Sequence, residues 1–156
     1  MGLEIEKKFK IKAMPDHLEQ YKCREIEQAY LNFSPVVRVR RDVLDGAEKY
    51  ELTYKGSGML SHPEFNLPLD QASYDNLLKK HDGLVIRKKR YMIPLSPYMI
   101  ELDVFLEELQ GLVIAEVEFP TVEEEISFVP PEWFGEEVTE SGEYSNARLA
   151  KKHCKS

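Results

Sequence analysis

Residues 98–105 read YMIELDVF and residues 111–119 read GLVIAEVEF, and in both stretches apolar and acidic side chains alternate. In a β-strand, side chains two residues apart point to the same face of the sheet. The acidic side chains of each stretch therefore share a face: Glu101, Asp103, Glu116 and Glu118. This alternation predicts two sheet strands that are apolar on one face and charged on the other.

The same alternation recurs towards the N-terminus, interrupted by turn-forming residues such as Ser34-Pro35 and Asp45-Gly46. Six further strands are predicted at residues 3–12, 25–33, 36–42, 49–55, 62–69 and 84–93. Helical patterns are few, at residues 15–21, 70–80, 121–127 and 144–152, the second with Asp70 as its N-cap. The predicted fold is mainly β (α+β), with eight antiparallel strands, a few peripheral helices and one domain over residues 1–156.

Composition excludes several classes of protein. The chain of 156 residues is 42% hydrophobic and 31% charged, with a net charge of -7, which argues against a general nucleic-acid binder. It contains no apolar run of membrane-spanning length and opens on alternating charges, so we expect a cytoplasmic protein with no membrane partner. Cys23 and Cys154 lie far apart in the sequence and are expected to be reduced.

The charged face of the predicted sheet carries pairs of like charge. Acidic pairs occur in three strands, and the basic residues of this face, one of which shares the first strand with an acidic pair, are Lys8, Arg38, Arg40, Lys55, Lys88 and Arg90. A solvated face is the ordinary interpretation of any one such strand. However, like charges side by side repel, and a bound ligand would resolve that repulsion. Carboxylate pairs suit Mg²⁺ or Mn²⁺, and Arg and Lys suit phosphate oxygens. Closure of the eight strands into a barrel would remove exposed edges, but periodicity alone leaves open which face points inward.

The opening Glu4-Ile5-Glu6-Lys7-Lys8 resembles the ExExK signature of the CYTH, or triphosphate tunnel metalloenzyme, superfamily. Further motifs follow in that superfamily's order: Arg38-Val39-Arg40, Thr53-Tyr54-Lys55, Lys88-Lys89-Arg90-Tyr91, Glu101-Leu102-Asp103-Val104-Phe105 and Glu116-Val117-Glu118-Phe119. The segment Trp133-Phe134-Gly135-Glu136-Glu137-Val138-Thr139 resembles the tail of its small bacterial members, which look most like inorganic triphosphatases. The resemblance implies a closed eight-stranded tunnel with the charged face inside and a metal-dependent hydrolase of a linear triphosphate.

The resemblance also implies roles for individual residues. The carboxylates expected to bind metal are Glu4, Glu6, Glu116 and Glu118, with Glu64, Glu101 and Asp103 for a second metal or for positioning water. The residues expected to hold inorganic triphosphate, or another small molecule bearing a triphosphate, are Lys8, Arg38, Arg40, Lys55, Lys88 and Arg90. Lys8, Glu101 and Asp103 are the predicted catalytic residues, and the general base is either Lys8 with a lowered pKa or a carboxylate of residues 98–119.

Two residues depart from the family pattern. Asn66 stands where the family often has an acidic residue, and His62 stands where it often has a basic one. Asn66 supplies no charge to a second metal, so that site is expected to differ. Three alternatives stay open at this point: a class IV type adenylate cyclase, a thiamine triphosphatase, and a polyphosphate- or nucleotide-binding module without turnover. The sequence does not fix the oligomeric state.

Overall fold

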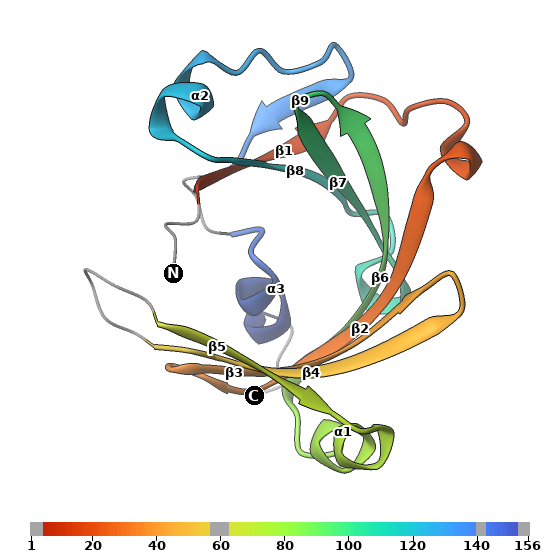
Figure 1. The fold of residues 1–156 in the computed structure, drawn as a ribbon, viewed down its shortest axis with the longest axis vertical. Helices are drawn as coiled ribbons and strands as arrows, with labels where there is room; N and C mark the ends of the chain where they lie inside the picture. The colour runs from red at the N-terminus through yellow and green to blue at the C-terminus, as the bar shows by residue number, and fades with distance from the viewer. Residues whose placement is uncertain (1–4, 57–62, 140–142, 153–156) are drawn as a thin grey trace. The chain divides into compact units, whose positions relative to one another are not determined.

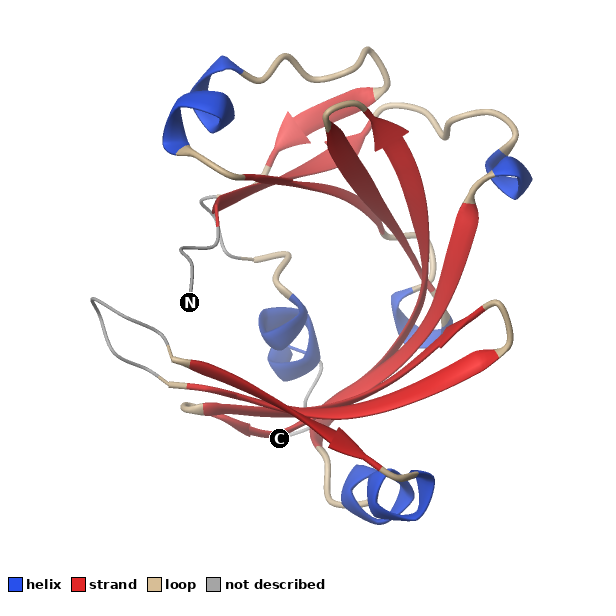
Figure 2. Cartoon of the chain, viewed as in Figure 1, coloured by secondary structure: helices blue, strands red, loops and turns tan. Residues whose placement is uncertain are grey.

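The computed structural model describes residues 5–56, 63–139 and 143–152 (Figure 1). Strands make up most of these residues, and the helices are short (Figure 2). The strands are β1 Ile5–Ile11, β2 Lys22–Phe33, β3 Val36–Leu44, β4 Ala47–Lys55, β5 Glu64–Leu69, β6 Asp82–Leu95, β7 Tyr98–Phe105, β8 Val113–Phe119 and β9 Phe134–Glu137. The helices are α1 Gln71–Leu78, α2 Val122–Ser127 and α3 Asn146–Lys152, with single 3₁₀ turns at Leu18–Gln20 and Glu107–Leu109.

The described residues divide into two compact units. The arginine unit holds Glu25–Arg87 and α3, and the carboxylate unit holds residues 5–24 together with residues 88–139, 143 and 144. Hydrogen-bonded neighbours follow the order β5-β4-β3-β2-β6-β7-β8-β1-β9. The prediction of eight strands closed into a barrel is therefore wrong for the described residues: there are nine strands, and the order ends at β5 and at β9 without pairing them. The mainly antiparallel β prediction is confirmed.

In the arginine unit, β3 pairs with β2 on one side and β4 on the other, and β4 pairs with β5. Helix α1 packs against the apolar face of this sheet, where Ala29, Val39 and Tyr74 form a buried cluster. As predicted, α1 begins at an Asp70 cap, whose Oδ1 accepts a hydrogen bond of 2.8 Å from the Ser73 N–H. The β3–β4 turn has positive φ angles at both Asp45 and Gly46, the geometry that an Asp-Gly hairpin favours.

In the carboxylate unit, β7 pairs with β6 and β8, and β1 pairs with β8 and β9. The apolar face of these strands carries the unit's core, formed by Phe9, Ile93, Ile100, Leu102, Ala115, Val117, Phe119 and Phe134. Helix α2 lies against β1 and β8, and Phe128 at its end contacts Phe9 and Phe119. The charged side chains of these strands are therefore left on the opposite face.

Most element boundaries differ from the predicted ones by one or two residues, and a few elements differ more. The residues around Phe134, for which no strand was predicted, form β9, which pairs Ile11 with Phe134. The helix predicted at residues 15–21 is a single 3₁₀ turn, and β2 begins three residues earlier than predicted. Cys23 forms no disulfide within the described residues, and Cys154 lies outside them. None of the described helices combines the length and the apolar character that crossing a membrane requires.

Candidate active site

The strand register of the carboxylate unit places its charged residues on one face. Glu6 lies opposite Glu118, and Lys8 lies opposite Glu116. Glu116 in turn lies opposite Glu101. On the other side of β7, Asp103 lies opposite Arg90. Because directly opposed residues in an antiparallel pair point to the same face, the β1, β6, β7 and β8 charges predicted to share a face do so.

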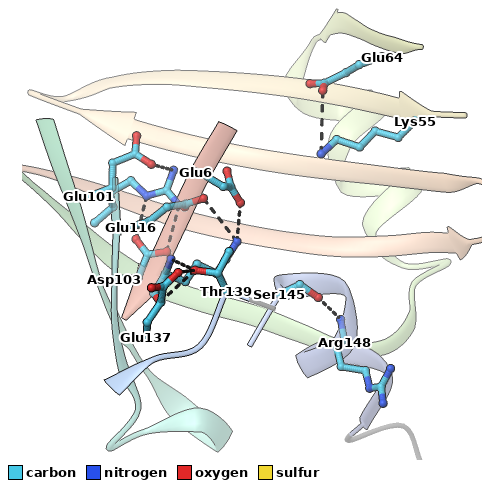
Figure 3. A network of polar contacts seen from close by, with 12 residues as sticks. Glu6, Lys55, Glu64, Glu101, Asp103, Glu116, Glu137, Thr139, Ser145 and Arg148 are labelled. Atoms are coloured by element: carbon cyan, nitrogen blue, oxygen red, sulfur yellow. Dashed lines mark hydrogen bonds and ion pairs between the residues drawn. The ribbon is translucent and has the colours of Figure 1, made fainter. Parts of the chain in front are cut away.

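The Lys8 ammonium lies between two carboxylates. Its Nζ is 2.7 Å from Glu6 Oε2 and 3.4 Å from Glu116 Oε2, and Figure 3 shows both carboxylates directed at the same nitrogen. Burial raises the pKa of Glu116 to about 7, and the neighbouring Glu6 adds to that rise, which Lys8 only partly offsets. Burial would lower the pKa of Lys8, but attraction by Glu116 and Glu6 outweighs it, so the pKa of Lys8 is raised.

The backbone of Lys8 is fixed by the segment that follows β9. The Lys8 N–H donates to Thr139 Oγ1 at 2.9 Å, and the Val138 N–H donates to the Lys8 carbonyl at 2.8 Å. Thr139 also donates to Glu137 Oε2 at 2.8 Å (Figure 3). The tail motif that resembles small bacterial triphosphatases therefore holds the backbone of a β1 residue in place.

Asp103 forms a buried ion cluster with two cations. Its Oδ2 accepts from Lys88 Nζ at 2.7 Å, and its Oδ1 accepts from Arg90 Nε at 2.8 Å. Burial opposes the charge on Asp103, but Lys88 and Arg90 outweigh it and lower the pKa of Asp103 to about 2. The Lys88 side chain is fully buried, so its charge is compensated inside the protein.

The remaining predicted metal ligands are more dispersed. Glu101 Oε1 lies 3.4 Å from Arg90 Nη1, Glu118 is exposed, and Glu4 lies outside the described residues. Within residues 5–56, 63–139 and 143–152, no three His, Cys, Asp or Glu side chains come together as a metal-binding group. Two of the predicted ligands, Glu6 and Glu116, flank Lys8.

The charged face of the arginine unit carries a chain of polar contacts across three strands. Arg38 Nη2 donates to Thr53 Oγ1 at 3.1 Å, and Thr53 donates to Asn66 Oδ1 at 2.7 Å. Asn66 Nδ2 donates to Glu64 Oε2 at 3.3 Å, and Glu64 lies 3.9 Å from Lys55 (Figure 3). Asn66 therefore orients the hydroxyl that accepts from Arg38.

Arg40 is held by an amide on the neighbouring strand. Its Nε donates to Gln28 Oε1 at 2.7 Å, and Gln28 lies directly opposite Arg40 in the β2–β3 register. Gln28 is fully buried. Two buried N–H groups on this face, Gln28 Nε2 and Arg38 Nε, have no hydrogen-bond partner among the described residues.

Comparison with known proteins adds a near full-length match. The chain is 34% identical to the inorganic triphosphatase of Nitrosomonas europaea over 148 residues, covering 94% of this chain and 96% of the relative. It is 35% identical to the inorganic triphosphatase of Acetivibrio thermocellus, covering 97% and 95%. The chain belongs to the inorganic triphosphatases of the CYTH superfamily. No protein-family model matches this triphosphatase sequence.

Solved structures support the same assignment. The crystal structure of an inorganic triphosphatase matches with a TM-score of 0.75 and 33% identity, over 97% of this chain and 96% of that one. A Pyrococcus horikoshii protein matches at 21% identity with a TM-score of 0.54, over 80% and 82%, which is a likeness of fold alone. The family membership expected from the sequence is confirmed.

Sequence reasoning gave no individual role to three residues that contact candidate site residues of this CYTH protein: Gln28, Thr53 and Thr139. Thr53 was noted only as part of a motif, because a hydroxyl carries no charge signal. Gln28 was detectable, since the Ser34-Pro35 hairpin aligns β2 with β3 and places an amide opposite Arg40. Thr139 was not, because its contact with Lys8 joins residues 131 positions apart. His62 lies outside the described residues.

Proposed function

We propose that this chain hydrolyses inorganic triphosphate to pyrophosphate and phosphate with the help of a divalent metal. One observation carries the proposal: a lysine flanked by two acidic side chains on the charged face of the sheet, at 2.7 and 3.4 Å. A cation-rich site with paired carboxylates suits a phosphoanhydride, which needs its negative charge neutralised as the phosphoryl group is transferred. The names of both curated relatives agree with this chemistry.

The acidic pair on β1 and β8 fits a hard divalent cation. The pKa of Glu116 is raised because this carboxyl is buried beside the Glu6 carboxylate. The ammonium of Lys8 offsets only part of that rise, so a further cation at this place would be stabilising. Oxygen donors of this kind suit Mg²⁺ or Mn²⁺. We assign Glu6 and Glu116 as the principal ligands, joined by Glu4 and Glu118, with Glu64 as a candidate for a second ion. The metal would neutralise phosphate charge and activate or orient water.

The cations divide into direct and indirect roles. Lys8, Arg38, Arg40, Lys55 and Arg90 are assigned to triphosphate oxygens. Because the pKa of Lys8 is raised, Lys8 stays protonated near neutral pH, which argues for phosphate binding and against a role as general base. Glu101 is the carboxylate assigned to orient the attacking water. Asp103 and the buried Lys88 are assigned to positioning Arg90, because both Asp103 oxygens already accept hydrogen bonds from these cations.

The test compares phosphate release from inorganic triphosphate, thiamine triphosphate and ATP, each with Mg²⁺, with Mn²⁺ and with EDTA. Fast metal-dependent release from inorganic triphosphate, abolished by EDTA, is expected. Glu116→Gln should lower kcat by about two orders of magnitude or more, as expected for losing a metal ligand. Preferential release from thiamine triphosphate, or cyclic AMP and pyrophosphate from ATP without phosphate release, would overturn the assignment. The cytoplasmic location stays a prediction.

A further inference from the structure

The strand register orders the charged face of the arginine unit into successive rows of side chains. Directly opposed residues of an antiparallel pair lie side by side on one face, and successive rows on that face are about 7 Å apart along the strands. Taken from β2 across to β5, the rows are Phe33, Val36, Lys55 and Glu64; then Tyr30, Arg38, Thr53 and Asn66; then Gln28, Arg40, Glu51 and Pro68; and last Ile26, Asp42 and Lys49.

Positive charge is concentrated in the row of Arg38. Its neighbours in that row are uncharged, and the nearer of them, Thr53, accepts from Arg38 Nη2 at 3.1 Å. In the next row, Arg40 lies directly opposite Glu51, so the formal charges of the row sum to zero. The row of Asp42 and Lys49 sums to zero in the same way. Formal charge along β3 therefore changes from positive at Arg38 to balanced from Arg40 onwards.

The carboxylate of Glu51 stands where the positive part of this face ends. Glu51 is half-buried, so water screens its charge only in part. A ligand whose last phosphate stops at Arg40 meets Glu51 at its end alone. A longer chain that continues along β3 would place further negative charges beside Glu51 and Asp42, and like charges at such distances repel. The face therefore favours a short chain of phosphates over a long one.

We propose that Glu51 is a specificity-determining residue that limits the substrate to a short phosphate chain by repelling the phosphates of a longer one. This inference rests on the proposed hydrolysis of inorganic triphosphate and extends it to discrimination against longer linear polyphosphates. The ordinary role for Glu51 is to orient Arg40 as an ion-pair partner. That role makes the opposite prediction, because loss of the Glu51 charge would then weaken the binding of triphosphate itself.

Two variants separate the charge of Glu51 from its size. Glu51→Gln removes the charge and keeps the size and a hydrogen-bond acceptor, whereas Glu51→Asp keeps the charge. The matched control is Glu48→Gln, the same change on the same strand but at an exposed position of the opposite face. The ligands are inorganic triphosphate, inorganic tetraphosphate and a medium-chain linear polyphosphate. The measurements are Kd by calorimetry in EDTA and kcat/KM with Mg²⁺, with Tm to show that each variant is folded.

Wild-type protein should bind triphosphate more tightly than the two longer ligands and should turn it over with a higher kcat/KM. Glu51→Gln should lower the Kd for tetraphosphate and for polyphosphate by about tenfold, while the Kd for triphosphate stays within about threefold. The kcat/KM for the longer ligands should rise accordingly. Glu51→Asp should keep the wild-type preference for triphosphate, and Glu48→Gln should match the wild type with all three ligands.

Four results would overturn the inference. They are a wild type that binds all three ligands equally, a Glu51→Gln variant that keeps the wild-type preference, one that binds triphosphate more weakly, and one that binds all three ligands more tightly by the same factor. The third would make Glu51 the residue that orients Arg40, and the fourth would reduce its role to a general effect of charge. Wild-type protein that binds triphosphate without hydrolysing it would refute the proposed enzyme, while the Kd series would still test Glu51. Wild-type protein that does not bind triphosphate would refute both.

Discussion

The two units of this CYTH protein hold their cations in different ways. In the carboxylate unit, Lys88 and Arg90 share the buried carboxylate of Asp103. In the arginine unit, Arg38 and Arg40 are held by a hydroxyl and an amide. The first arrangement makes charge part of the folded structure, because separating the buried partners would leave them uncompensated. The second gives each guanidinium an uncharged acceptor on a neighbouring strand, and Arg40 also lies directly opposite Glu51 on β4.

The largest effect is expected from breaking the buried ion cluster. Asp103→Asn removes the carboxylate that accepts hydrogen bonds from both Lys88 and Arg90 and puts a neutral amide beside these two buried cations. Loss of one partner of such a cluster should lower the free energy of unfolding by about 3–5 kcal/mol. Urea denaturation measures this, with Asp75→Asn on the exposed side of α1 as the control. A loss under 1 kcal/mol would mean that the cluster does not stabilise the fold.

The same cluster gives an acid signature. The pKa of Asp103 is lowered in the folded protein to about 2 from its ordinary 3.8, so the cluster stabilises the fold above the ordinary value. That contribution is lost as pH falls from about 4 towards 2. Thermal unfolding between pH 2 and pH 5 should show this loss in the wild type, and the Asp103→Asn variant should show a flatter profile. If the wild type and the Asp103→Asn variant lose stability in parallel as pH falls, Asp103 is not the source of the acid-induced loss.

A second pH effect of opposite sign comes from Glu116. Its pKa is raised to about 7 from 4.5 in the folded protein, so the folded state binds this proton more tightly than the unfolded state. Stability of the metal-free protein should therefore fall by on the order of 2 kcal/mol as pH rises from 4.5 to 7. Glu116→Gln should remove this dependence of stability on pH. Adding Mg²⁺ at pH 7.5 should restore the stability of the wild type but should not stabilise the Glu116→Gln variant. Chemical denaturation in EDTA and in Mg²⁺ gives both answers.

A smaller effect is expected from the neutral acceptor of Arg38. Thr53→Val is nearly isosteric, but it removes the hydroxyl that accepts from Arg38 and donates to Asn66. We expect a loss of about 1–2 kcal/mol in stability and a rise of about fivefold in KM, with kcat little changed. If kcat falls while KM stays constant, Thr53 stabilises the transition state. That result would contradict the expectation that Thr53 acts only by orienting Arg38.

The smallest effect is expected at the backbone support of Lys8. Thr139→Val removes the acceptor of the Lys8 N–H at 2.9 Å without touching the Lys8 side chain. The loss should be about 1 kcal/mol in stability, with kcat reduced by less than about tenfold. Thr139→Ser, which keeps the hydroxyl, should restore most of both. A serine variant as impaired as the valine variant would attribute the effect to packing of the Thr139 methyl group instead.

Much of the charged face could be predicted because strand periodicity is a local property. Alternation alone placed Glu101, Asp103, Glu116 and Lys8 on one face, and the strand register agrees. What the alternation could not supply is the pairing between strands. The prediction that Asp103 binds metal came from the family resemblance, and only the hydrogen bonds between strands reveal that Lys88 and Arg90 occupy its oxygens.

The missed features share a physical cause. β9 is four residues long and gains its stability from pairing with β1, more than 120 positions away in the sequence, so it has no strong local signal. Closure of the sheet is a global property that periodicity does not encode. The neutral residue Thr53 has no signal in the sequence either, because its contact is with Arg38 across the strand pair.

The alternation of β3 limits how this gene can change in length. Arg38 and Arg40 face one way while Val39 between them is fully buried on the other side. A one-codon insertion or deletion inside β3 would exchange the two faces beyond it, sending a guanidinium into the core and a valine onto the charged face. We therefore expect homologous sequences to vary in length at turns such as Asp45-Gly46 and to keep the residue count within the strands, so gaps in an alignment should mark the strand ends.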